Sequence, residues 1–188
     1  MGAMRSLAGL LLLVASAASC RLPRMYGEDV AVRVQGLYGF QEVDVARLDG
    51  HAIAGLEVVT EDPHNSWGYE IGAQYGHESE ETPQRRHEAE FNELYVGMRR
   101  GWTRGAMHPY FGLGASWARV ENTLRTSGPT VEFDDDSGGA YVRGGLLWSL
   151  GRYDFDRGTE ILMGIDARGL VGDDFDMAQI ALVLAFGT

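Results

Sequence analysis

Two short acidic segments contain the densest groups of possible metal ligands in the sequence. The first group is Glu132, Asp134, Asp135 and Asp136, and the second is Asp173, Asp174 and Asp176. Carboxylate oxygens are the preferred ligands of Ca²⁺ and Mg²⁺, so the aspartates of both groups are candidate metal ligands. Neither segment has the Asp-x-Asp-x-Asp-Gly spacing of an EF-hand loop. Solvated acidic loops are therefore the simpler interpretation, and we expect no bound metal and no other cofactor.

Five histidines are the other candidates for metal binding or proton transfer. They are His51, His64, His77, His87 and His108. No pair of them has the spacing of a zinc motif such as His-Glu-x-x-His. All five fall near loops or strand ends, so we expect isolated histidines and no zinc site.

Eight charged residues recur within stretches that otherwise contain apolar and small residues. They are Arg33, Glu57, Glu70, Glu93, Arg99, Arg143, Asp166 and Arg168. Buried charges must be paired and hydrogen-bonded, and four acids and four arginines can satisfy one another. We therefore expect a structural ion-pair network. The alternative is that some of these charges line a proton or ion path, or a catalytic centre.

The elements that position these charges are eight segments of period-two alternation, which predict β-strands. Their ranges are 30–42, 51–60, 67–77, 90–102, 108–121, 139–151, 160–171 and 177–187. No stretch shows a convincing helical period. The connections 77–89 and 121–138 are longer than 61–66, 103–106 and 152–159, which indicates that the two ends of the fold differ.

The other face of the predicted strands is apolar and is bounded by aromatic residues at both ends. Tyr38, Phe40, Tyr75 and Trp117 fall at one end, and Trp67, Phe111, Trp148 and Phe186 fall at the other. An apolar band between two aromatic girdles is typical of a barrel that crosses a membrane. The predicted fold class is therefore all-β, an eight-stranded antiparallel up-and-down transmembrane β-barrel with a lumen filled by side chains.

Three segments carry a family resemblance. Residues Glu93–Arg99, His108–Ser116 and Ile180–Phe186 resemble the fourth, fifth and last strands of the OmpA/OmpX-like superfamily of small outer-membrane barrels. The resemblance covers residues 30–188. It implies a monomer in the bacterial outer membrane that contacts lipid and lipopolysaccharide and is assembled by the barrel-insertion machinery. A nucleic-acid partner is not expected, because the net charge is −11.

The N-terminal residues have the features of an export signal. Arg5 precedes an apolar run over 7–18, which is too short to cross a bilayer as a helix. Cys20, the only cysteine, follows small residues and resembles the lipidated cysteine of bacterial lipoproteins. We expect a signal peptide over 1–19, a periplasmic linker over 20–29 and the barrel over 30–188, with the N-terminus in the periplasm. The alternative is ordinary cleavage after Ala17 or Ala18.

Two functional alternatives remain beside a structural, non-enzymatic barrel that serves envelope integrity or surface interaction. Pro63–Ser66 contains a His–Ser pair that resembles the motif of outer-membrane lipid A deacylases, and His77 or His87 could serve an acyltransferase. A lipid-modifying enzyme is thus the main alternative. The other is a soluble, lipocalin-like ligand-binding lipoprotein, which requires an apolar interior and a polar exterior.

Overall fold

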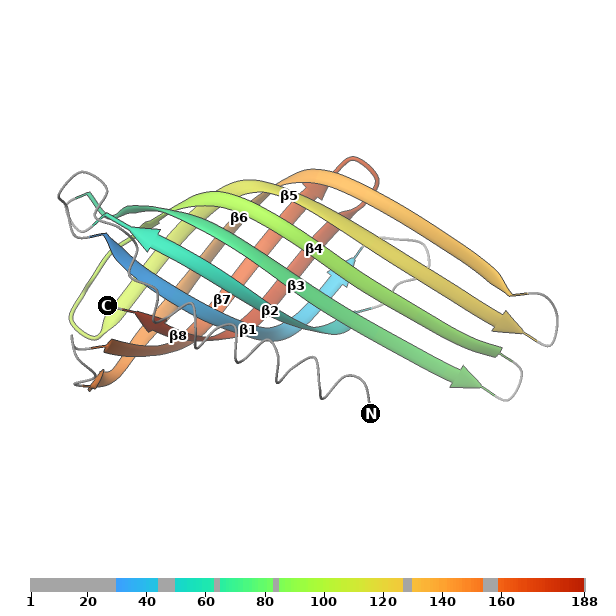
Figure 1. The fold of residues 1–188 in the computed structure, drawn as a ribbon, viewed down its shortest axis with the longest axis horizontal. Coiled ribbons are helices and arrows are strands. Elements are labelled where there is room, and N and C mark those ends of the chain that lie inside the picture. The colour runs from blue at the N-terminus through green and yellow to red at the C-terminus, as the bar shows by residue number, and fades with distance from the viewer. Residues whose placement is uncertain are drawn as a thin grey trace.

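The computed structural model describes residues 30–43, 50–62, 65–82, 85–126, 130–153 and 159–187. In this part of the chain eight antiparallel strands form a closed barrel, with each strand beside its neighbours in sequence and β1 paired with β8 (Figure 1). The strands are β1 Ala31–Val43, β2 His51–Glu61, β3 Trp67–Thr82, β4 Arg85–Gly101, β5 Met107–Thr126, β6 Val131–Tyr153, β7 Thr159–Gly172 and β8 Asp176–Gly187. The predicted eight-stranded up-and-down barrel is confirmed. The expected signal peptide, linker and lipidated Cys20 lie outside the described residues.

Strict alternation of side chains explains why these segments form a barrel wall. In β8, buried and exposed residues alternate at every position from Asp176 to Phe186. A strand of this kind places one face against the lumen and the other against the surroundings. None of the described residues belongs to a helix that is long and apolar enough to cross a membrane.

Four strands are much longer than the sequence indicated. The prediction of loops over 77–89 and 121–138 is wrong, because β3 continues to Thr82, β4 begins at Arg85, β5 continues to Thr126 and β6 begins at Val131. Cross-strand pairs such as Glu78↔Ala89 and Arg85↔Thr126 extend the ladders without a break. These segments alternate between polar residues and only a few apolar ones, so composition alone resembled that of a loop.

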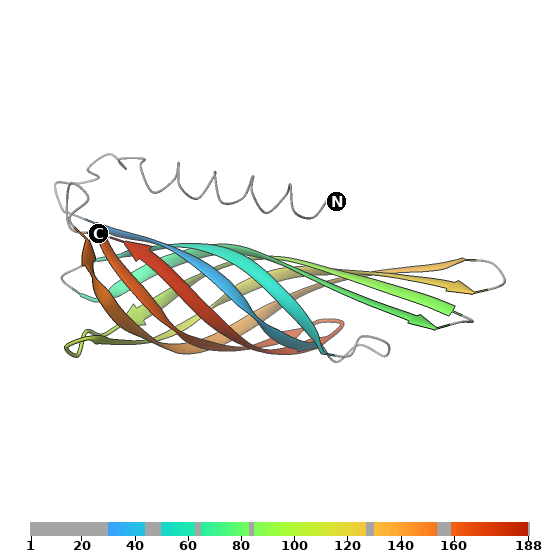
Figure 2. The same ribbon diagram turned by 90° about the horizontal axis from the view of Figure 1, so that it is seen from below.

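The extended strands project together from one end of the barrel as a four-stranded sheet, seen in green to orange in Figures 1 and 2. The pairing of β2 with β3 stops at Gly76, and the pairing of β6 with β7 starts at Gly139. We call this end the hairpin end. The opposite end carries the tight Arg104–Met107 turn, in which Gly105 has a positive φ of 63°, and we call it the turn end.

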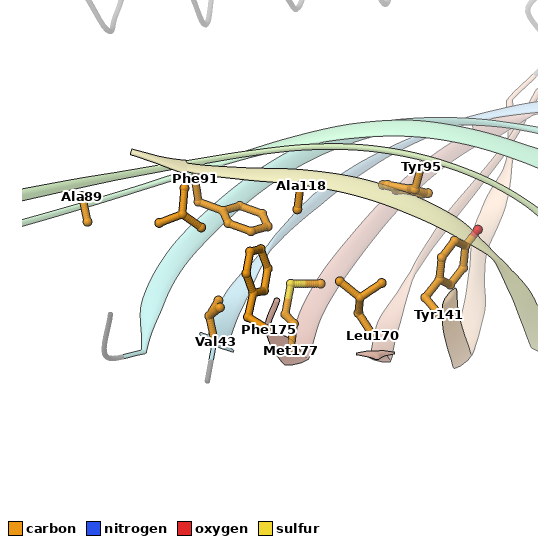
Figure 3. Close-up of a cluster of buried hydrophobic side chains, with 10 residues drawn as sticks. Val43, Ala89, Phe91, Tyr95, Ala118, Tyr141, Leu170, Phe175 and Met177 are labelled. Atoms are coloured by element: carbon orange, nitrogen blue, oxygen red, sulfur yellow. The ribbon is translucent and has the colours of Figure 1, made fainter. Parts of the chain in front are cut away.

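The interior is less uniformly polar than the sequence suggested, because two apolar clusters lie inside the barrel. One fills the hairpin end (Figure 3) and comprises Val43, Ala89, Phe91, Tyr95, Ala118, Val120, Tyr141, Leu170, Phe175 and Met177. The other lies toward the turn end and comprises Leu37, Tyr110, Leu147, Leu162, Ala181, Val183 and Ala185. The charged residues therefore share the lumen with apolar side chains, and Asp166 pairs directly with Ala181 of the second cluster.

Two glycines make room for tyrosine rings inside this narrow lumen. A Cβ at Gly72 would lie 2.3 Å from Cζ of Tyr95, and a Cβ at Gly145 would lie 2.4 Å from the hydroxyl of Tyr110. Each ring thus crosses the lumen over a residue without a side chain. This arrangement lets an eight-stranded barrel hold large residues from neighbouring strands.

The outer surface is apolar. Ile71, Val96 and Leu182 are exposed by 63%, 56% and 62%. All eight aromatic residues predicted for the two ends of this face are exposed: Tyr38, Phe40, Tyr75, Trp117, Trp67, Phe111, Trp148 and Phe186. A soluble ligand-binding barrel needs the opposite distribution, so the lipocalin-like alternative is inconsistent with this structure.

Candidate functional site

Glu57 is the centre of the buried charge network. Its carboxylate forms an ion pair with Arg143, and Nη1 of Arg99 lies 3.4 Å from its Oε1. The hydroxyl of Tyr95 donates a hydrogen bond of 2.8 Å to its Oε2. Glu57 is fully buried, so these partners replace all of its contacts with water.

Arg143 connects Glu57 to two further carboxylates. Its Nε and Nη2 both lie 3.0 Å from Oδ2 of Asp166, and its Nη1 lies 3.4 Å from Oε2 of Glu70. Both acids also accept a hydrogen bond from a tyrosine hydroxyl: Tyr110 donates to Asp166 at 2.6 Å, and Tyr141 donates to Glu70 at 2.6 Å. Three of the predicted acids, Glu57 included, are therefore joined through one guanidinium.

Glu93 organises a second cluster closer to the hairpin end. Its carboxylate contacts Arg168 as an ion pair and accepts hydrogen bonds from Gln74 and Ser116. The amide nitrogen of Gln74 also donates to Oε1 of Gln179 at 3.0 Å. Four strands, β3, β4, β5 and β7, thus meet at one carboxylate, and β8 joins them through Gln179.

A third group lies toward the turn end around Glu61. Nη1 of Arg33 lies 3.2 Å from Oε1 of Glu61, and Nη2 of Arg99 lies 2.9 Å from the same oxygen. Arg99 therefore links Glu61 to Glu57. Glu61 was not among the predicted residues, although it follows Glu57 at an even spacing and so shares its face.

The structure places all eight predicted charges on the lumen face and brings them into these three groups. Sequence reasoning missed the three tyrosines that donate to the acids, Tyr95, Tyr110 and Tyr141. The sequence held one signal for them. Each tyrosine lies an even number of residues from a polar lumen residue of its own strand, namely Glu93, Ser116 and Arg143, and so shares its face. Arginine also stacks on these rings: Cζ of Arg168 lies 4.5 Å from the centre of the Tyr95 ring.

This packing leaves little room for water among the described residues of the lumen. Glu57 and Arg99 have no exposed surface, and Glu93 retains 1%. A water-filled channel would leave lumen side chains in contact with solvent. The arrangement is chemically that of tightly packed, buried ion pairs that share the lumen with apolar side chains.

The acidic groups occupy the hairpin end. Asp134, Asp135 and Asp136 are exposed on β6, and Asp173 and Asp174 follow β7. The two groups are adjacent, since the amide of Asp174 donates to the Ser137 hydroxyl at 3.2 Å. The described residues include no group of three or more histidine, cysteine or acidic residues that could hold a metal ion.

Arg119 occupies the position where this acidic surface meets the aromatic residues of the hairpin end, such as Trp117. Its Nε donates to Oδ1 of Asp134 at 2.9 Å and lies 3.0 Å from Oε1 of Glu121. Hydrogen bonding to Asp134 and the charge of that carboxylate raise the pKa of Arg119, which lies beyond Trp117 and outside the apolar band. The carboxylate of Asp134 is thus paired with the guanidinium of Arg119.

The histidines do not converge within the described part of the chain. His51 packs against Phe91, with ring centres 5.6 Å apart, and His77 is exposed on β3. His64 of the Pro63–Ser66 segment lies outside the described residues. His108 comes nearest to a catalytic arrangement, because its Nδ1 lies 3.5 Å from the Thr103 hydroxyl and its Nε2 lies 3.7 Å from Glu160.

No family model and no curated protein matches the sequence. Among solved structures, the attachment invasion locus protein Ail of Yersinia pestis is similar, with a TM-score of 0.59 and 13% identity over 86% of this chain and 99% of Ail. A major outer membrane protein of Thermus thermophilus has a TM-score of 0.59 and 10% identity over 86% of this chain and 100% of that protein. The N-terminal β-barrel domain of Pseudomonas aeruginosa OprF has a TM-score of 0.50 and 11% identity over 84% and 97%.

The fold is therefore that of the small outer-membrane β-barrels. The resemblance inferred from the strand segments is confirmed at the level of fold. Sequence identities of 10–13% carry no information about the activity of this chain.

Proposed function

We propose that this chain is a non-enzymatic, integral protein of a bacterial outer membrane with a closed lumen. The supporting observation is the inside-out distribution of side chains: fully buried ion pairs inside, and exposed aliphatic residues between two aromatic girdles outside. A continuous apolar surface of this size is costly in water and is stable against lipid. The proposed partners are outer-membrane lipid, lipopolysaccharide and, during assembly, the barrel-insertion machinery.

The asymmetry of the two ends supports an orientation with the turn end in the periplasm. Outer-membrane barrels have short periplasmic turns and longer outer connections. Here β1 begins and β8 ends at the turn end, and the long hairpins leave from the other end (Figure 2). A signal peptide over 1–19 and a linker over 20–29 that can carry a lipid on Cys20 would both precede β1 on the periplasmic side.

A closed lumen supports a structural role for the barrel over a pore function. The test is to insert the purified full chain into a planar bilayer and record ionic current. We expect no steady conductance in the wild type, because buried ion pairs and apolar side chains fill the lumen. Stable single-channel steps in the wild type would contradict the closed lumen. Failure of the folded chain to enter any bilayer would contradict the membrane location itself.

Surface interaction is a second proposed role, and the four-stranded extension favours it. Residues 77–82 of β3 and 131–138 of β6 pair with a strand on only one side in the described structure. Open strand edges can accept an extended segment of another protein. The β6 edge carries Glu132, Asp134, Asp135 and Asp136, which would select a basic segment.

A shortened hairpin tests this role. Because Glu78 pairs with Ala89, residues 79–88 can be replaced by Asn-Gly with the register kept. We expect bacteria that display this variant to adhere less to cultured epithelial cells than those with the full chain. The barrel should remain folded, as judged by its resistance to unfolding in detergent. Equal adherence of both strains would contradict a contact role for the β3–β4 hairpin.

The enzymatic alternative has weak geometric support. Thr103, His108 and Glu160 form the only hydroxyl–imidazole–carboxylate line that the described hydrogen bonds and ion pairs contain, at 3.5 and 3.7 Å. These distances exceed those of working hydrogen bonds. In the proposed orientation the line also lies on the periplasmic side, away from outer-leaflet lipid A. A His108→Asn variant should therefore leave the lipid A acylation pattern of the cell unchanged by mass spectrometry.

A further inference from the structure

Arg100 is a cation on the outside of the barrel wall, at the girdle of the turn end. It lies on β4 directly opposite Trp67 of β3. Its Cζ is 5.7 Å from the ring centre of Trp67 and 5.5 Å from that of Trp102. The guanidinium therefore lies close to two indole rings that are themselves exposed by 41% each.

Arg100 differs from the other arginines of the barrel wall in its charge partners. Arg33, Arg99, Arg143 and Arg168 of the barrel wall all pair with acids inside the lumen. Arg100 takes part in none of the ion pairs between described residues, and the outward residues next to it on the same strand are Met98 and Val96. A charge at the edge of an apolar band needs a partner from the headgroup layer.

Phosphate is the group that this geometry fits. A guanidinium presents paired N–H donors that match two phosphate oxygens, and the indole N–H groups of Trp67 and Trp102 are further donors. Arg104 lies two residues after Trp102 in the tight turn and adds a second positive charge. We infer that Arg100, Trp67 and Trp102 bind the phosphate of an anionic glycerophospholipid; this inference rests on the membrane location proposed above.

The charge of the opposite rim supports a phospholipid partner over lipopolysaccharide. At the hairpin end the outward face just beyond Tyr75 and Trp117 carries three exposed acids, Glu90, Glu121 and Asp134, together with one arginine, Arg119. Lipopolysaccharide occupies the outer leaflet and would meet this acidic rim. Arg100 and Arg104 are both at the turn end, which faces the phospholipid leaflet in the proposed orientation.

Tryptophan quenching by brominated lipids can test the inference directly. The chain has four tryptophans, so a Trp117→Phe, Trp148→Phe background leaves Trp67 and Trp102 as the reporters. This full-length variant is inserted into mixed phosphatidylcholine and phosphatidylglycerol vesicles in which either lipid carries bromine. We expect phosphatidylglycerol to be enriched about fivefold over its bulk share beside these tryptophans, the enrichment that one cation near an anionic lipid surface produces.

Two substitutions in this background identify the cation responsible. Arg100→Gln should bring the quenching by the two brominated lipids to the ratio of their bulk shares. Arg119→Gln removes the same charge at the opposite rim and should leave the preference unchanged. Equal preference before and after Arg100→Gln, or no preference at the start, would overturn the phospholipid site while the membrane location stands. Absence of quenching by either lipid would overturn both proposals.

Discussion

At the scale of the residue, Glu93 shows how strongly one lumen charge is tied to its surroundings. It contacts Arg168, Gln74 and Ser116, which come from three different strands. Removing one partner of a buried ion pair leaves the other charge without compensation, and this usually costs more than the intact pair contributes. The stability of the barrel should therefore depend on the charge of Glu93 and not only on its shape.

Glu93→Gln keeps the shape and removes the charge. We expect the free energy of unfolding to fall by about 3 kcal/mol, because Arg168 would remain buried without a counter-charge. Urea titration of the protein in lipid vesicles measures this difference. Glu121→Gln on the exposed surface of β5 is the matched control and should change the free energy by less than about 0.5 kcal/mol. Equal effects of the two substitutions would show that the network contributes no net stability.

The predicted charges could be found from the sequence because buried arginine and glutamate are rare unless they are paired. Residues an even number apart along a strand point to the same side, so these charges could be assigned to one face. The partners of each charge could not be predicted, because they depend on the register between strands distant in sequence. Arg143, for example, meets Glu57 across 86 positions of the chain. Tyr95, Tyr110 and Tyr141 were missed because a tyrosine is equally common in an outward girdle.

At the scale of the element, β3 and β4 depend on a glycine that faces a tyrosine ring. Gly72 pairs with Tyr95, and the ring of Tyr95 lies over the position where a Cβ would stand. The ring cannot move far, because its hydroxyl donates to Glu57 and its edge packs against Tyr141. The glycine is therefore required by the lumen packing and not by the backbone conformation.

Gly72→Ala tests this requirement. A methyl group 2.3 Å from the Tyr95 ring must displace it, so we expect a loss of about 2 kcal/mol of unfolding free energy. Gly144→Ala is the control, since the nearest atom to its Cβ is a carbonyl oxygen 3.7 Å away. Thermal or urea unfolding in the same lipid separates the two variants. A stable Gly72→Ala barrel would mean that Tyr95 can leave its place without cost.

The pattern of side chains along the strands explains why loops were predicted where the structure has strands. Alternation between apolar and polar residues is clear where one face meets an apolar environment, as in β8. Residues 78–82 and 85–88 of the extension are all polar, so they show no contrast between the two faces. Their strand character comes from pairing with neighbours, such as Glu88↔Thr123, and not from a pattern of hydrophobicity.

At the scale of the whole molecule, a membrane protein and a soluble barrel differ in what surrounds the outer surface, lipid or water. Leu182 lies in the middle of β8, outward, between Ile180 and Leu184, and is exposed by 62%. An arginine there would be harmless on a soluble protein, because an exposed position places few demands on its side chain. In a bilayer the same arginine would lie at the depth where charge is least tolerated.

Leu182→Arg should therefore lower the free energy of unfolding by about 2–4 kcal/mol in lipid vesicles, the cost of an arginine on the lipid face near the midplane of a barrel. Leu150→Arg supplies the control for depth, since Leu150 is similarly exposed, at 56%, but lies near the turn end. There the cost should fall to at most about 1 kcal/mol, because the side chain reaches the headgroups. Urea titration of both variants in the same vesicles measures the difference. Similar small losses at the two positions would contradict the proposal that this surface lies against hydrocarbon, whereas a clear dependence on depth would show that the bilayer is the solvent of the apolar band.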